Sequence, residues 1–177
     1  MGSHAPLAHV TSSGRARMVD VGDKLPTRRM ARAEAVVRLG RRLARLLRAR
    51  GAVSKGGVIE TARVAGIMAA KRTGELVPLC HPLSLDWVDI EAHLGQESVR
   101  LEAIVRCRAA TGVEMEALTA VSVAALTVYD MCKSITKGIV IERIRLLEKA
   151  GGRSGTWKAG GRKAGGKGQG TSRGATN

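Results

Sequence analysis

Aromatic side chains are almost absent from this chain of 177 residues. They make up 2% of it, as Trp87, Trp157 and Tyr129, and there is no phenylalanine. Proteins that bind single-stranded nucleic acid stack the bases on aromatic rings. The scarcity therefore weighs against such a surface, although it leaves open binding to the phosphates of duplex DNA.

Cysteine is scarce as well, and no apolar run is long. Cys80, Cys107 and Cys132 form no C-x-x-C pair and no zinc-ligand pattern. Isolated cysteines, together with an N-terminus that lacks a signal-peptide pattern, predict a reducing compartment, the cytoplasm. The longest apolar run, 118–128, is shorter than the roughly 18 residues of a membrane span, so no membrane partner is expected.

Acidic residues are half as numerous as basic ones, 15 against 30, which gives a net charge of +15. Residues 151–177 contain ten glycines, six Lys/Arg and no acid, a composition typical of a flexible cationic tail. The remaining chain still carries +9. A basic folded part favours an anionic partner, either nucleic acid or a small phosphorylated substrate.

Hydrophobic periodicity changes several times along the chain. Period-two alternation predicts strands, and i, i+3, i+4 spacing predicts amphipathic helices. In chain order the pattern predicts a strand at 31–39, helices at 40–50 and about 58–72, a β-hairpin over 88–105, a helix at 115–134 and a strand at 139–147. The second helix is rich in small residues, so we expect it to be buried.

This order of elements predicts an α+β fold in which helices cover one face of an antiparallel sheet. The length is that of one domain. We expect three parts: a flexible N-terminal segment (1–17), a folded domain (18–157) and the Gly/Lys-rich tail (158–177).

Two candidate sites lie in turns. Lys55 precedes two glycines and a helix start, where free N–H groups favour phosphate; a plain glycine turn with a solvated lysine explains the same pattern. His81 follows Cys80 between two prolines and has the chemistry of an acid or base. A histidine that caps a turn is an equal alternative, and nothing predicts a lowered thiol pKa for Cys80.

Two more candidates lie at opposite ends of the helix predicted at 115–134. Glu114 and Glu116 would face one side of an extended backbone and bind amino groups of a substrate, or they complement the helix dipole. Asp130 and Lys133 share a helix face. Their apolar neighbours predict a partly buried acid with a tuned pKa, and an ordinary helix ion pair is the alternative.

The separation of these two clusters has a geometric consequence. Glu116 and Asp130 are 14 residues apart, which is about 21 Å along one helix. A single small substrate does not span that length easily. We therefore predict that the site is shared between subunits of a homo-oligomer.

Several long motifs together resemble the cyclic pyranopterin monophosphate synthase family. They occur in order over about residues 18–157: Met18-Val19-Asp20-Val21, Lys55-Gly56, Thr61–Thr73, Leu76–Leu83, Thr111–Ala120, Tyr129–Lys133 and Gly151–Gly155. The resemblance implies a ferredoxin-like α+β subunit in a dimer-based hexamer. It also implies a lyase that converts a cyclic GTP derivative, supplied by a radical enzyme, into a pyranopterin with release of pyrophosphate.

The resemblance also implies which residues act. Carried over position by position, the catalytic residues are Asp130, Lys133, Lys55 and His81. The substrate-binding residues are Leu79, Cys80, His81, Glu114, Met115, Glu116 and, less securely matched, Arg29. No metal ligand and no cofactor is expected, although Mg²⁺ would suit a polyphosphate.

Two other function classes remain compatible with the composition alone. If the protein were a basic nucleic-acid-binding protein, it would bind generic duplex in a salt-dependent way. If it were a non-enzymatic oligomeric scaffold, the four candidate sites described above would be ordinary surface charges. Neither explains why charged residues sit at the ends of apolar elements. We therefore expect no specific nucleic-acid partner.

Overall fold

The computed structural model of the protein describes residues 9–50 and 57–160. Five strands form one antiparallel sheet: β1 (Thr27–Arg38), β2 (Trp87–Leu94), β3 (Ser98–Ala109), β4 (Val140–Ala150) and β5 (Trp157–Lys158). The helices are α1 (Arg41–Arg50), α2 (Val58–Lys71), the short α3 (Thr73–Leu76) and α4 (Glu114–Cys132).

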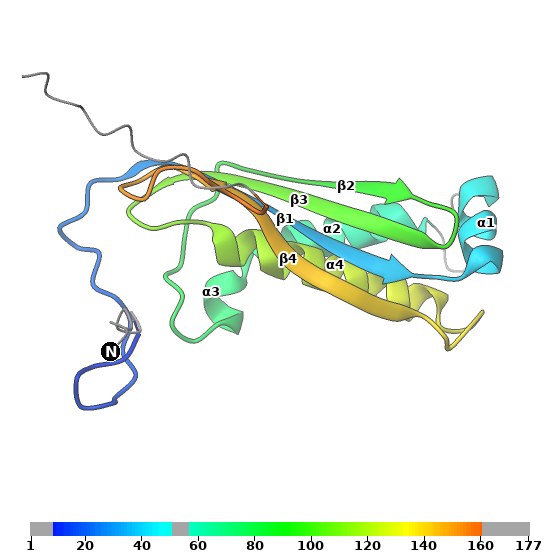
Figure 1. Cartoon of the computed structure of the whole chain (residues 1–177), viewed down its shortest axis with the longest axis horizontal. Helices are drawn as coiled ribbons and strands as arrows, with labels where there is room; N and C mark the ends of the chain where they lie inside the picture. The colour runs from blue at the N-terminus through cyan, green and yellow to red at the C-terminus, as the bar shows by residue number, and fades with distance from the viewer. Residues whose placement is uncertain (1–8, 51–56, 161–177) are drawn as a thin grey trace, which may run out of the picture.

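The strands lie in the order β2-β3-β1-β4-β5, with every neighbouring pair antiparallel. Without the short β5, the chain runs β-α-β-β-α-β with the spatial order 4-1-3-2, which is the ferredoxin-like arrangement. Helices α2 and α4 pack side by side on one face of the sheet, and the other face is open (Figure 1). The predicted α+β class and one-sided helix layer are confirmed.

The core lies between the sheet and these two helices. Alternate residues of β1 face it, namely Ala31, Ala33, Ala35 and Val37, all with no exposed surface. Four small residues of α2 are also buried against the core: Ala62, Gly66, Ala69 and Ala70. Small side chains let α2 approach α4 closely. The predicted burial is confirmed for this face only, because Val64 and Met68 on the other face are 56% and 49% exposed.

Helix α4 is long and apolar enough to cross a membrane by length and composition. Its packing gives another reason for the apolar sequence, because nine of its residues are buried, among them Val121, Ala124 and Val128. It contacts β1, β3, β4 and α2. A helix at the centre of a core is apolar around most of its circumference.

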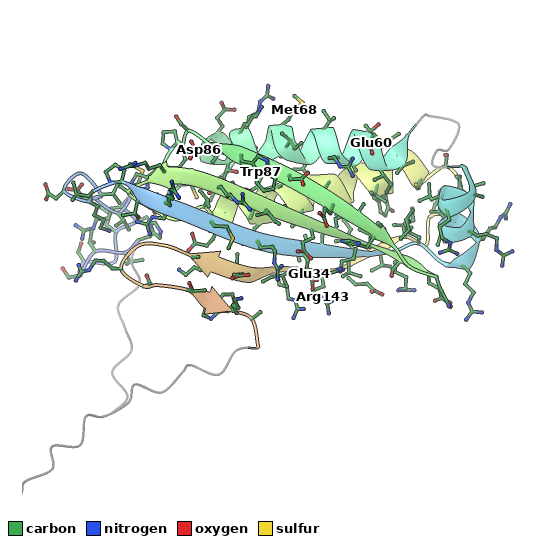
Figure 2. The ribbon with its side chains drawn as sticks, turned by 90° about the horizontal axis from the view of Figure 1, so that it is seen from above. Glu34, Glu60, Met68, Asp86, Trp87 and Arg143 are labelled. Carbon is green, nitrogen blue, oxygen red and sulfur yellow. The ribbon has the colours of Figure 1, made fainter. Side chains whose placement is uncertain are left out.

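The open face of the sheet carries ion pairs instead of a second helix layer. The Glu34 carboxylate, whose side chain is only 4% exposed, lies 2.8 Å from Arg145 and 3.1 Å from Arg143 (Figure 2). Arg100 approaches it at 3.9 Å. A buried carboxylate is tolerated here because it has several cationic partners.

The structure differs from the sequence prediction at the ends of elements. Strand β1 begins at Thr27, four residues before the predicted start, and α3 was not predicted. Residues 151–160 form a turn and β5, which pairs with β4, so the change of composition at Ala150 does not end the folded part. Residues 9–17 include a bridge between Val10 and Ala16. Of the predicted flexible segments, 1–17 and 158–177, the parts at 1–8 and 161–177 lie outside the described residues.

Candidate active site

Two pockets adjoin each other at the N-terminal end of α4. Four residues line both of them and form their common wall: Lys24, Thr111, Gly112 and Glu114. The first pocket is cationic and the second is largely apolar. Together they form one continuous two-part site.

The apolar pocket has a volume of about 320 Å³. It collects six of the predicted substrate-binding residues: Leu79, Cys80, His81, Glu114, Met115 and Glu116. The segment 79–81 is held by local structure, because the Cys80 N–H donates to the Val77 carbonyl at 3.0 Å and α3 packs closely on Pro82 at Gly74. This pocket brings His81 and Glu116 to the same cavity.

Burial dominates the electrostatics of this pocket. Loss of solvent raises the pKa of Glu116, its own backbone N–H opposes the rise, and the charge of Glu114 adds to it. Burial, and secondarily the charge of Glu116, also raises the pKa of the Cys80 thiol. Cys80 therefore stays protonated at neutral pH and is a poor nucleophile, whereas Glu116 is suited to hold a proton.

The raised pKa of Glu116 predicts a pH-dependent gain in stability for Glu116→Gln. The folded pKa lies above the unfolded value of about 4.3, so the wild-type carboxyl reduces stability as pH rises through the folded pKa. A neutral amide avoids that loss. Urea unfolding should show the variant more stable than wild type at pH 7, with the difference shrinking towards pH 4. An unchanged difference at both pH values would contradict this expectation.

Glu114 and Glu116 do not share a side, as an extended backbone would require. Helix α4 begins at Glu114, so the two side chains diverge around the first helical turn. Glu116 is 3% exposed in the apolar pocket, whereas the Glu114 carboxylate lies 2.8 Å from the Lys149 ammonium in the cationic pocket. A Cβ at Gly112 would overlap the Glu114 carboxylate, so this glycine lets the carboxylate fold back.

The cationic pocket has a volume of about 240 Å³ and contains residues that the sequence analysis did not single out. Lys24 comes from the loop before β1, Lys149 from the end of β4 and Arg153 from the following turn, and the hydroxyls of Thr111 and Ser154 line the same wall. With Arg29, four cations face one carboxylate. This excess of positive charge suits a polyphosphate.

Arg29 is held in place by three carbonyl groups. Its guanidinium donates to Ala109 at 3.2 Å, to Ala110 at 3.1 Å and to Gly151 at 3.3 Å. Gly151 and Gly152 have positive φ angles of 101° and 71°, and a side chain at Gly152 would overlap the Arg29 guanidinium. The two glycines thus let the turn after β4 close over Arg29.

The Asp130–Lys133 cluster lies at the opposite end of α4, outside both pockets. The two side chains form an ion pair of 2.6 Å, and Asp130 is 62% exposed. The prediction of partial burial is therefore wrong for the single chain, because Asp130 points away from the core on a turn whose Met131 and Cys132 are buried. The hydrogen bond to Asp130 and its charge raise the pKa of Lys133. Lys55 lies outside the described residues.

Metal binding has no visible basis in the described part of the chain. Over residues 9–50 and 57–160, no group of three or more His, Cys, Asp or Glu side chains is arranged to hold a metal ion. The charged groups of the site are predominantly cationic. Its side chains are suited to bind an anion and to move protons.

Comparison with known proteins assigns the family. The model of the MoaC family matches residues 18–152, most of the chain. The chain belongs to the MoaC family. The match begins at the loop that carries Val19 and Val21 and ends at the Gly151–Gly152 turn over Arg29. It includes every residue that lines the two pockets except His9, Arg153 and Ser154.

Curated relatives agree with this assignment. The chain is 54% identical over 153 residues to "Cyclic pyranopterin monophosphate synthase" of Novosphingobium aromaticivorans, covering 86% of this chain and 97% of the relative. It is 54% identical over 156 residues to the protein of the same name from Thermomicrobium roseum, covering 87% and 93%. It is 57% identical over 153 residues to "Molybdenum cofactor biosynthesis protein 1" of Drosophila melanogaster, covering 85% of this chain but only 27% of that longer protein.

Proposed function

We propose that the protein is a cyclic pyranopterin monophosphate synthase, a lyase of molybdenum cofactor biosynthesis. Its substrate is (8S)-3′,8-cyclo-7,8-dihydroguanosine 5′-triphosphate, and its products are cyclic pyranopterin monophosphate and pyrophosphate. One observation carries the proposal: a cationic pocket and a largely apolar pocket share a wall at Glu114, in a chain 54% identical to synthases of that name over nearly their whole length.

The two pockets match the two halves of this substrate. The triphosphate fits the cationic pocket, where Lys24, Lys149 and Arg153 supply charge and Arg29 is fixed by its carbonyl partners. The guanine-derived ring fits the apolar pocket beside Leu79, Cys80 and Met115. Glu114 and Glu116 would accept hydrogen bonds from its amino and N–H groups, and a protonated Glu116 would also donate one.

The remaining predicted residues supply proton transfer. In this proposal Asp130 is the general acid/base and Lys133 tunes it. His81 shuttles a proton or contacts phosphate, and Lys55 holds the triphosphate or acts as a second acid. These roles suit a reaction that opens one ring, closes another and expels pyrophosphate, because each step moves protons or places charge on phosphate.

A complete site requires more than one subunit in this proposal. Asp130 lies about 21 Å along α4 from Glu116, and both pockets are at the Glu116 end. A partner chain that brings its own Asp130 and Lys133 to these pockets would complete the site. We infer a dimer-based homo-oligomer, a hexamer, in the cytoplasm, acting after the radical enzyme that makes the substrate. Mg²⁺ would accompany the polyphosphate.

Turnover tests the proposal directly. Purified protein is given the cyclic GTP derivative, freshly made by the radical enzyme, and pyrophosphate release is followed together with the fluorescence of the oxidised pterin. Both signals should appear, and both should be absent without the protein. GTP in place of the derivative is the matched control and should give neither. A folded oligomer that gives neither signal with the derivative would disprove the proposed activity.

A further inference from the structure

A second hollow lies on the open face of the sheet, away from the helix layer. Its floor is a row of side chains that crosses four neighbouring strands: Trp87 on β2, Arg106 on β3, Met30 on β1 and Ala150 on β4. The volume is about 410 Å³, and the lining is completed by Arg28, Arg29, Asp86, Cys107 and Gly151. We call this the Trp87 hollow. Its size is that of a small-molecule site.

The hollow exposes an aromatic platform in a protein that has only three aromatic residues. Trp87 is 40% exposed, and the Arg106 guanidinium lies over its ring, 4.5 Å from the centroid. Trp87 and Asp86 lie beside each other at the start of β2 (Figure 2). An indole with a stacked guanidinium is a surface on which a flat heterocycle packs well.

The charges of the hollow differ from those on the rest of this sheet face. In the middle of the face, the carboxylates of Glu34, Glu102 and Glu148 all have cationic partners. In the hollow, Arg28, Arg106 and Asp86 take part in none of the ion pairs formed between described residues. The Arg28 guanidinium and the Asp86 carboxylate are therefore available to a ligand, whereas the Arg106 guanidinium is stacked on the Trp87 ring.

We propose that the Trp87 hollow binds a guanine nucleotide at a site separate from the catalytic pockets. The base stacks on the Trp87–Arg106 pair, Asp86 accepts hydrogen bonds from it, and Arg28 holds the phosphates. Guanine offers two adjacent donors, N1–H and the exocyclic amino group, which match the two oxygens of a carboxylate. Adenine has an acceptor at N1, so the same carboxylate disfavours it.

The hollow adjoins the cationic pocket, and Arg29 is the one charged residue that lines both. Arg29, Met30, Ala150 and Gly151 line both cavities, and the Arg29 guanidinium is already bonded to three carbonyls. Trp87, Asp86 and Arg106 line neither catalytic pocket. These three residues can therefore be changed without altering the proposed active site, and the inference does not rest on the proposed reaction.

Calorimetric titration of the full chain with GDP and, separately, ADP tests the site. The two nucleotides carry the same phosphates, so their difference reports the base. Wild type should bind GDP about tenfold more tightly than ADP, an advantage of one good base-edge contact. Trp87→Leu should weaken GDP binding at least about fivefold because the stacking platform is lost. Asp86→Asn should abolish the preference for GDP.

Two control variants locate the binding. Trp157→Leu removes the other tryptophan, and Glu116→Gln alters the apolar catalytic pocket; both should leave the GDP affinity of the hollow unchanged. Loss of GDP binding in Glu116→Gln but not in Trp87→Leu would place the nucleotide in the catalytic pocket and overturn the inference. Absence of GDP binding to wild type at millimolar concentration would overturn it too.

The same variants separate this site from the proposed reaction. Trp87→Leu should retain turnover of the cyclic GTP derivative while it loses GDP affinity. A wild-type protein that binds GDP in the hollow but releases no pyrophosphate would retain this inference and reject the proposed activity. If the protein turns over the derivative normally but binds GDP equally well with and without Trp87, the proposed activity is retained and the nucleotide site in the Trp87 hollow is rejected.

Discussion

Oligomers assembled from equal amounts of Glu116→Gln and Asp130→Asn chains should recover about a quarter of wild-type turnover, although each variant alone loses at least about 100-fold. The reason is the position of the two residues, at opposite ends of α4 and about 21 Å apart along its axis. If one site takes Glu116 from one subunit and Asp130 from another, random mixing leaves both intact in about one site in four. The measurement is pyrophosphate release after the two chains are unfolded together and refolded.

A second mixture provides the control for this experiment. Asp130→Asn combined with Lys133→Met alters the same cluster, which one subunit supplies, because the two residues form a 2.6 Å ion pair. These chains should not complement each other. If the Glu116→Gln and Asp130→Asn mixture stays at the level of its parents while exchange of subunits is confirmed by mass spectrometry, the shared site is wrong.

Replacement of Glu116 should change turnover and stability in opposite directions. Burial raises the pKa of its carboxyl, so Glu116→Gln should gain stability at neutral pH while it loses turnover. Catalytic groups held in unfavourable surroundings often behave in this way. If Glu116 had only a structural role, its replacement would leave turnover unchanged.

The sheet and the main helices could be predicted because their signals are local. The period-two alternation of residues 31–39 places every second side chain of β1 in the core, and Ala31, Ala33, Ala35 and Val37 are buried. The two alternating runs around Gly95 form the hairpin of β2 and β3 as expected. Patterns of this kind depend only on neighbouring residues, so they can be recognised without knowledge of the tertiary structure.

The cationic pocket could not be predicted because it depends on register between distant strands. Lys149 pairs with Ala31, whose side chain faces the helix layer, and it therefore reaches Glu114 at the start of α4. Register shifts at Arg32/Ala33 and Val36/Val37 stand between this pair and the far end of β4. Each shift by one residue turns side chains to the other face, so sequence alternation alone does not place Lys149.

The start of α4 was the other source of error in the site. The apolar pattern predicts a helix that begins at residue 115, and an extended backbone there would place Glu114 and Glu116 on the same side. One more residue of helix, from Glu114, turns the two side chains apart. Glu116 lines only the apolar pocket, whereas Glu114 lies in the wall between the pockets and pairs with Lys149. Helix ends are uncertain by one or two residues, and here that margin decides in which direction the Glu114 side chain points.

Gly66→Ala should destabilise the protein, although alanine favours helices more than glycine does. A Cβ at Gly66 would lie 2.7 Å from the Ala120 carbonyl oxygen and 3.2 Å from the Ala124 Cβ, and it would overlap the Ile90 side chain. Alanine's helix propensity returns up to about 1 kcal/mol, whereas overpacking costs about 1–3 kcal/mol. We expect a net loss of about 1–2 kcal/mol for Gly66→Ala and at least about 3 kcal/mol for Gly66→Leu.

The matched control is Gly57→Ala at the N-cap of α2. Its nearest neighbour would be the Glu60 Cβ at 3.8 Å, an ordinary contact, so its free energy of unfolding should change by less than about 0.5 kcal/mol. Urea unfolding of all variants at one protein concentration makes the comparison. If the Gly66→Ala protein were more stable than wild type, α2 and α4 would be able to move apart without a cost in free energy of unfolding. The close contact would then not hold the helix whose two ends carry Glu116 and Asp130.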